Sequence, residues 1–234
     1  MSSYISLTRQ SGLMAEMRTI ANNMANLSTT GFRREGVIFS EWVSSAGEGP
    51  STSMGAARGR NVDLSQGPLN RTGGTLDLAI EGEGFFTVET PDGPRLTRAG
   101  AFQPSGNGDL VTPDGHLVLD AGGAPIFVPP DARGVAVAAD GTVSADGRPI
   151  SQIGLVVPRD PTELERTGDT LFRAEGGTDP AESATILQGF VEGANVNQVL
   201  ELARMIEVQR AYELGQGFLD RESKRVSSVI ETLG

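Results

Sequence analysis

The sequence contains no cysteine among its 234 residues. The chain can therefore form no disulfide bond, no thiolate zinc site and no thiol nucleophile. Aromatic residues make up only 5% of the chain, so the core must be built mainly from aliphatic side chains. A cysteine-free protein is insensitive to redox conditions, and this absence does not identify its compartment.

Positive charge is also scarce. Lys224 is the only lysine, and 30 acidic residues against 19 basic ones give a formal net charge of −11. Binding to nucleic acid requires a basic face, because the phosphate backbone is negatively charged. We therefore expect no nucleic-acid partner.

Long apolar runs are missing as well. The N-terminal stretch MSSYISLTRQSGLMAEMR has none long enough for a signal peptide, and no later segment is apolar enough to span a bilayer. We expect no direct membrane insertion. Two possibilities stay open: the protein remains in the cytosol, or it leaves by a route that needs no cleaved signal.

The sequence does contain an amphipathic pattern near its N-terminus. Apolar residues recur there at alternating steps of four and three, which predicts a helix packing along a narrow seam. These residues are Leu13, Met17, Ile20, Met24 and Leu27. The run Ser28-Thr29-Thr30-Gly31 should end the helix, and we assign residues 1–41 to this N-terminal region.

A longer pattern occupies the C-terminus, where residues 190–234 predict a second helix running from about Val196 to Leu233. Asn195 is the expected N-cap, with Gln198 completing a variant of the capping box. The residues predicted to form its seams and assembly interface are Asn195, Val199, Leu202, Met205, Ile206, Tyr212, Leu219, Val226 and Leu233.

Between the two helices the pattern changes to short alternating strands. Asp-Gly pairs occur at 92–93, 114–115, 140–141 and 146–147, and each predicts a hairpin turn. We expect an all-β domain over residues 76–189, joined to the first helix by an extended Gly/Ser-rich connection over 42–75. The predicted fold class is α+β: long N- and C-terminal amphipathic helices, paired like an antiparallel coiled coil, flank a central all-β domain.

Three asparagines lie near the end of the first predicted helix: Asn22, Asn23 and Asn26. Asparagine is a mediocre helix former, but a polar residue in a helix–helix seam can fix register and partner. The alternative is that these side chains are solvated at a fraying helix end. The sequence leaves both interpretations open.

Two slim helices would leave part of their apolar surface in water. Residues such as Leu7, Val199, Ile206 and Leu214 lie outside the narrow seams, and neighbouring copies could cover them. The pattern therefore predicts a subunit of a polymer. Gly215 and Gly217 should weaken the second helix by about 1 kcal/mol each.

Signals for chemistry are weak. His116 is the only histidine and has no visible catalytic partners, and Glu81-Gly82-Glu83-Gly84 lacks the third glycine of a dinucleotide-binding loop. The Asp-Gly pairs lack the further acidic ligands of a calcium loop. We predict no catalytic residue, no metal site, no cofactor and no enzymatic activity.

Several blocks of this sequence resemble the flagellar basal-body rod and hook family. The blocks keep the family's order and cover nearly the whole chain. They are residues 21–26 (ANNMAN), 30–32 (TGF), 76–86 (LDLAIEGEGFF), 96–102 (LTRAGAF), 108–112 (GDLVT), 188–196 (QGFVEGANV) and 205–213 (MIEVQRAYE). Each block alone is a weak signal, whereas together they are specific.

The resemblance implies a structural subunit of the bacterial flagellar basal-body rod. Such a subunit assembles with copies of itself and other axial proteins into the hollow drive shaft that transmits motor torque to the hook and filament. It is exported by the flagellar type III apparatus without a cleaved signal peptide and resides in the rod, spanning the periplasm. The chain is too short for a hook protein, and its short connecting segment favours a proximal rod member. The alternatives are a distal rod subunit, or a ligand-binding β domain with helical appendages.

Overall fold

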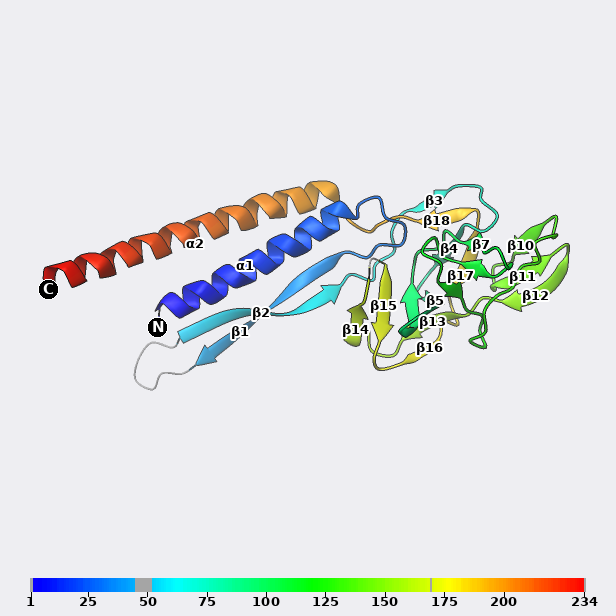
Figure 1. The fold of residues 1–234 in the computed structure, drawn as a ribbon, viewed down its shortest axis with the longest axis horizontal. Helices are drawn as coiled ribbons and strands as arrows, with labels where there is room; N and C mark the ends of the chain where they lie inside the picture. Colours follow the sequence, from blue (N-terminus) through cyan, green and yellow to red (C-terminus); the bar gives the residue numbers. More distant parts are fainter. Residues whose placement is uncertain (1, 45–51, 169, 234) are drawn as a thin grey trace. The chain divides into compact units, whose positions relative to one another are not determined.

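The computed structural model describes residues 2–44, 52–168 and 170–233 (Figure 1). The chain divides into two compact units. Unit 1 comprises Met1–Ala25, Glu35–Asp63 and Val196–Gly234, and unit 2 comprises Asn26–Arg34 and Leu64–Asn195. The chain therefore passes from one unit to the other four times.

Unit 1 contains both α-helices, α1 (Ser2–Ala25) and α2 (Gln198–Leu233). They run side by side in opposite directions, as Figure 1 shows. Three side-chain hydrogen bonds between the helices follow this antiparallel order, and they join Gln10 to Tyr212, Glu16 to Arg204, and Asn23 to Glu201.

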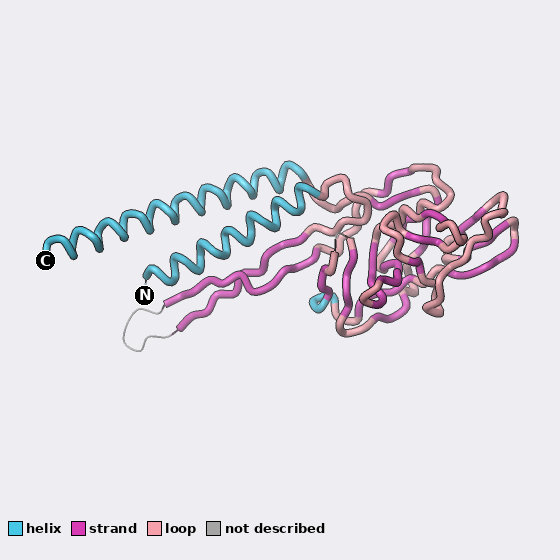
Figure 2. The backbone as a smooth tube through the Cα atoms, in the orientation of Figure 1, coloured by secondary structure: helices cyan, strands magenta, loops and turns pink. Residues whose placement is uncertain are grey.

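A two-stranded ribbon completes unit 1. Strand β1 (Glu35–Ser44) pairs antiparallel with β2 (Thr52–Val62), and both strands contact α1. In Figure 2 the two strands extend beside the helices. The register shifts by one residue between Ile38 and Phe39, which marks a β-bulge.

The predicted fold class is wrong for this part of the chain. Helix α1 ends at Ala25 and has 24 residues against 36 in α2, so the long N-terminal helix predicted for a coiled-coil-like pair is absent. The ribbon is formed by Glu35–Ser44 and Thr52–Val62, which the prediction had divided between the N-terminal helical region (1–41) and the extended connection (42–75). The physical reason lies in EGVIFSEWVS, where β-branched and aromatic residues favour a strand. Unit 1 is therefore a helix pair plus a strand pair, rather than a coiled coil flanking a β domain.

Unit 2 consists of short antiparallel strands. In chain order they are β3 (Leu69–Arg71), β4 (Leu78–Glu81), β5 (Phe85–Thr90), β6 (Gly93–Thr97), β7 (Gln103–Pro104), β8 (Leu110–Val111), β9 (Leu117–Val118), β10 (Val135–Val137), β11 (Thr142–Ala145), β12 (Arg148–Gln152), β13 (Leu155–Pro158), β14 (Leu164–Arg166), β15 (Leu171–Ala174), β16 (Thr178–Pro180), β17 (Thr185–Gln188) and β18 (Phe190–Glu192). A 3-10 turn, η1 (Pro161–Glu163), precedes β14.

The largest sheet of unit 2 has nine strands. Its main order is β14-β15-β6-β5-β9-β8-β7, and β13 and β16 join it through β5. Strands β10, β11 and β12 form a second sheet, and β17–β4 and β18–β3 each form a separate two-stranded sheet. All four Asp-Gly pairs lie in turns between paired antiparallel strands, so the hairpin prediction is confirmed.

A mainly aliphatic core holds these sheets together. The rings of Phe86 and Phe102 meet edge to face at 5.1 Å within it. The buried members of this core are Leu78, Ile80, Phe86, Val88, Phe102, Leu110, Val118, Ile126, Val128, Val137, Val143, Ile153 and Ile186. Strands β4 and β17 contribute to it, and they bring the signature blocks at 76–86 and 188–196 into the same unit.

Candidate functional site

The first candidate surface is an exposed apolar face of unit 1. Large hydrophobic side chains usually lie in cores, so an exposed group of them on one helix is informative. Among the side chains that the structure describes, those exposed on α2 are Val199, Leu200, Leu202, Ile206, Leu214 and Phe218, and Leu7 is exposed on α1. Val199 and Leu214 each keep 75% of their surface accessible. We call these seven residues the apolar face.

The residues that the sequence proposed for assembly divide into groups. Seven residues on α1 and α2 are buried or half-buried: Leu13, Met17, Ile20, Met24, Met205, Tyr212 and Leu219. They stabilise unit 1 itself. Val199, Leu202 and Ile206 are exposed on the apolar face.

The remaining predicted residues lie elsewhere. Asn22 is exposed on α1, whereas Asn26, Leu27 and Asn195 are half-buried residues of unit 2. The side chains of Val226 and Leu233 lie outside those that the structure describes. A role in assembly stays a prediction for the whole set.

Asn23 is completely buried, so for this residue the structure excludes the interpretation of a solvated side chain at a fraying helix end. Its Nδ2 donates to the backbone oxygen of Glu35 at 2.8 Å and to Oε2 of Glu201 at 3.2 Å. Its Oδ1 accepts from the backbone N–H of Glu35 at 3.0 Å. One amide thus joins the end of α1, the start of β1 and the first turns of α2, and it fixes their register.

The predicted helix cap was placed two residues too early. Helix α2 begins at Gln198, and Oδ1 of Asn197 accepts the N–H groups of Val199 at 3.1 Å and Leu200 at 3.2 Å. Asn197 is therefore the N-cap. Asn195 has a different function within unit 2.

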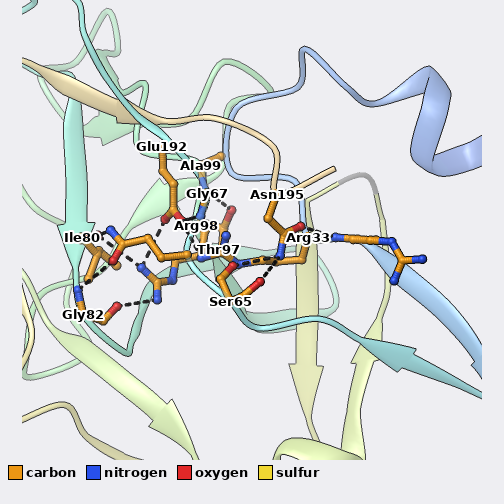
Figure 3. Close-up of polar contacts among 12 residues, drawn as sticks. Arg33, Ser65, Gly67, Ile80, Gly82, Thr97, Arg98, Ala99, Glu192 and Asn195 are labelled. Carbon is orange, nitrogen blue, oxygen red and sulfur yellow. Dashed lines mark hydrogen bonds and ion pairs between the residues drawn. The ribbon is translucent and has the colours of Figure 1, made fainter. Parts of the chain in front are cut away.

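Asn195 ties together three segments of unit 2, each next to a point where the chain leaves for unit 1. Its Oδ1 accepts the N–H of Arg34 at 2.6 Å, and its Nδ2 donates to the backbone oxygen of Ser65 at 2.9 Å (Figure 3). The chain crosses between units directly after Arg34, directly before Leu64 and directly after Asn195 itself. We call this arrangement the Asn195 clamp.

A second candidate site is a buried charge cluster in unit 2. Nη2 of Arg33 lies 2.7 Å from Oε1 of Glu192, and Nη1 of Arg98 lies 3.2 Å from Oε2 (Figure 3). The side chains of Arg33 and Glu192 are completely buried, and Arg98 is 3% exposed. The same carboxylate accepts the backbone N–H of Gly67 at 2.7 Å. Two guanidinium groups therefore share one buried carboxylate.

Arg98 is held by backbone as well as by charge. Its Nη2 donates to the oxygen of Gly82 at 2.7 Å, and its Nη1 donates to the oxygen of Ile80 at 3.4 Å. Desolvation by burial lowers the pKa of Arg98 to about 10, and Glu192 opposes that shift. Arg98 stays charged near neutral pH and joins the ends of β4 and β6 to the end of β18.

The block Thr30-Gly31-Phe32 packs against this cluster. Gly31 has a φ of +71°, and its N–H donates to the backbone oxygen of Glu192 at 2.7 Å. A Cβ added to Gly31 would lie 2.2 Å from the backbone N of Ala99. The guanidinium of Arg166 lies 4.4 Å from the ring centre of Phe32 and 4.6 Å from that of Phe172. The block is therefore an internal packing element, which fixes the chain after α1 to unit 2.

Arg98 and Glu192 lie within the family-like blocks at 96–102 and 188–196, but no sequence pattern marks them as partners of each other or of Arg33. Their charges were a clue. A charged residue that is buried requires a partner of opposite charge, so an arginine in one glycine-containing block and a glutamate in another are candidates for an ion pair. Gln10, Glu16 and Arg204 were also missed. They occupy polar positions beside the apolar stripe, and periodicity does not reveal cross-helix hydrogen bonds.

Three family models of flagellar axial proteins match parts of this chain. Residues 4–33 match the "Flagella basal body rod protein" family, residues 79–145 match "Flagellar hook protein FlgE/F/G D1 domain", and residues 187–222 match "Flagellar basal body rod FlgEFG protein C-terminal". Arg33 and Arg98 lie in the first two matches and Glu192 in the third. Among the described residues, neither helix combines the length and apolar character needed to cross a bilayer.

Individual relatives cover the chain from end to end. Flagellar basal-body rod protein FlgF of Caulobacter vibrioides is 40% identical, over 99% of this chain and 97% of the relative, and FlgF of Mesorhizobium japonicum is 38% identical with the same coverage. Flagellar basal-body rod protein FlgG of Bacillus subtilis is 32% identical over 90% of each chain. The chain therefore belongs to the flagellar basal-body rod protein family, is of the FlgF type within it, and is a structural subunit of the rod in the basal body.

Proposed function

We propose that the chain is built into the rod through the apolar face of unit 1 and there carries motor torque toward the hook and filament. Family membership supports assembly with other flagellar axial proteins. Copies of this chain and further rod subunits are the partners that we propose. The relatives are structural rod proteins, and the proposed mechanism is mechanical, without an enzymatic step.

The observation that carries this proposal is the concentration of exposed apolar residues on one helix. Six of the seven members of the apolar face lie on α2. Burying apolar surface contributes about 25 cal/mol per Å², so contacts of a few hundred Å² yield several kcal/mol before ordering costs. Repeated from subunit to subunit, such contacts are strong enough to hold a shaft together.

The route to the rod is part of the proposal. The N-terminus lacks an apolar run of signal-peptide length. We propose export by the flagellar type III apparatus without a cleaved signal, followed by assembly in the periplasm. An intact N-terminus on the chain recovered from purified basal bodies, read by mass spectrometry, is the expected result.

The central test places a charge on the apolar face. Ile206 is 44% exposed, so Ile206→Asp should leave the fold of the purified chain unchanged while blocking its recovery in basal bodies and abolishing swimming. Ser223→Asp is the matched control, because Ser223 is exposed on the same helix but lies outside the apolar face. A buried position such as Ile20, 2% exposed, would unfold unit 1 instead and test nothing about assembly.

The alternative functions predict other outcomes. A ligand-binding β domain would tolerate Ile206→Asp, so normal basal bodies and normal swimming with that variant would contradict the rod proposal. If the chain were instead a distal rod subunit, Ile206→Asp would remove it from the end of the rod nearest the hook. The FlgF relatives of Caulobacter vibrioides and Mesorhizobium japonicum are 40% and 38% identical to this chain, against 32% for FlgG of Bacillus subtilis, and this difference supports the FlgF type over the FlgG type.

A further inference from the structure

Two glycines in the middle of α2 have different surroundings. A Cβ added to Gly215 would lie 2.1 Å from Nε2 of Gln10, which donates to the backbone oxygen of Tyr212 at 3.0 Å. A side chain at position 215 would therefore displace the Gln10 amide from a contact within unit 1. A Cβ added to Gly217 would meet nothing within 4 Å. Since glycine destabilises a helix interior, Gly217 has a cost that no contact among the described residues explains.

The space beside Gly217 forms a shallow hollow on the surface of α2. It has a volume of about 530 Å³ and is lined by Arg210, Glu213, Leu214, Gly217 and Arg221. Nε of Arg221 donates to the backbone oxygen of Gly217 at 3.1 Å, which holds that side chain along the helix beside the hollow. Leu214 is one of the residues that line the hollow, and it keeps 75% of its surface exposed. The helix thus presents an apolar knob next to a hole.

We propose that Leu214 of one copy inserts into the hollow over Gly217 of a second copy in the rod. This inference rests on the proposed function and names the contact between subunits. A leucine side chain fits a hollow of this volume, and a glycine floor lets two helices approach closely. Subunits of a shaft share one polarity, so the knob of each copy meets the hole of the next and the contact repeats without closing.

Charge selects α2 of a second copy over α1 as the occupant. The hollow carries two guanidinium groups, Arg210 and Arg221, against the single carboxylate of Glu213. The exposed charged residues of α1 are Arg9 and Arg18, which would be repelled. Helix α2 carries the same two arginines, but it also has Glu213 directly before the knob. That carboxylate can pair with Arg210 or Arg221 of the neighbouring hollow, whereas the one acidic residue of α1, Glu16, is already paired with Arg204.

The absence of native cysteine makes a direct crosslinking test possible. Two differently tagged copies, Leu214→Cys and Gly217→Cys, are expressed together in cells lacking the original copy, and purified basal bodies are oxidised. The expected product joins the two tags by a disulfide, and either variant alone gives little of it. A product that joins Gly217→Cys to a different protein overturns the assignment of a second copy, as does no product from basal bodies that contain both tags.

A size series keeps the proposal testable if the cysteine variants fail to enter the rod. Gly217→Leu fills the hollow and should lower incorporation at least about tenfold, whereas Ser227→Leu adds the same bulk at another exposed site and should not. Gly217→Ala should lower it less, and adding Leu214→Ala, which shortens the knob, should restore part of the loss. Normal incorporation of Gly217→Leu overturns the knob-and-hole contact, and failure of Ile206→Asp in the same assay shows that the rod function stands independently.

Discussion

Nη2 of Arg33 and Oε1 of Glu192 lie 2.7 Å apart, and both side chains are completely buried. The two residues come from blocks near opposite ends of the chain, and β18 carries one of them into contact with the segment that follows α1. Charges removed from water are costly unless they are paired, so each depends on the other for its place in the fold. Arg98 shares the same carboxylate and increases that dependence.

Removing the shared carboxylate should strongly destabilise unit 2. Glu192→Gln leaves two buried guanidinium groups without a counter-charge, and we expect the free energy of unfolding to fall by about 3–5 kcal/mol. Urea denaturation followed by circular dichroism measures this. Glu165→Gln removes an exposed partner of Arg173 and should cost less than about 1 kcal/mol. Equal losses in the two variants would contradict the importance of the buried cluster.

Arg98 should give stability a distinctive dependence on pH. Burial lowers its pKa to about 10 in the folded chain, well below the ordinary value of an arginine. Between these values the unfolded chain binds more protons than the folded one, so the Arg98 contribution to the free energy of unfolding rises with pH. Below about pH 9 both states are protonated and this contribution is constant. Comparing the pH slopes of the original chain and Arg98→Met from pH 8 to 11 tests this prediction, and identical slopes would refute it.

Gly31 should tolerate no side chain. Gly31→Ala places Cβ 2.2 Å from the backbone N of Ala99 and forces a non-glycine residue to a φ of +71°, so we expect a loss of about 3 kcal/mol or more. Gly73 is a matched control, because its φ is +77° but an added Cβ meets nothing within 4 Å. Gly73→Ala should cost only about 1–2 kcal/mol. A Gly31→Ala chain as stable as Gly73→Ala in urea would show that the close approach to Ala99 does not matter.

Asn23 should contribute far more than its neighbour Asn22. Asn23→Ala removes three buried hydrogen bonds to Glu35 and Glu201, and we expect unit 1 to lose about 2–4 kcal/mol. Asn22 is exposed, and Asn22→Ala should change stability by less than about 0.5 kcal/mol. Hydrogen exchange of the α1 amides reads out the difference. Unchanged protection in Asn23→Ala would restore the interpretation of these asparagines as solvated residues at a helix end.

Local patterns predicted much of unit 2 but not the composition of unit 1. Each Asp-Gly pair specifies its own hairpin, because the turn needs only residues adjacent in sequence. The β1–β2 ribbon was missed because its second strand, TSMGAARGRNV, has little alternation and few β-branched residues. That strand is stabilised by pairing with β1 and by α1, which are tertiary contacts that propensity does not contain.

The candidate site shows the same division. Apolar periodicity located the faces of both helices, but it could not separate the residues that pack within the chain from those left exposed, since both groups repeat with the helix. Ile20 and Leu202 were both predicted to lie in the seams, yet one is 2% exposed and the other 49%. The partners of Arg33 and Asn23 are set by the packing of distant segments, and spacing along the chain carries no information about them.

Because the chain crosses between the two units four times, a single break in the backbone does not separate them. Two domains joined by one linker come apart when that linker is cleaved. Here any mechanical load between the units is shared by four peptide connections. At the unit 2 ends of three of these connections the Asn195 clamp holds the neighbouring segments together, so a break in one can be bypassed through the others. In a subunit that carries torque, as proposed here, the topology of the chain therefore provides redundant connections between the two units.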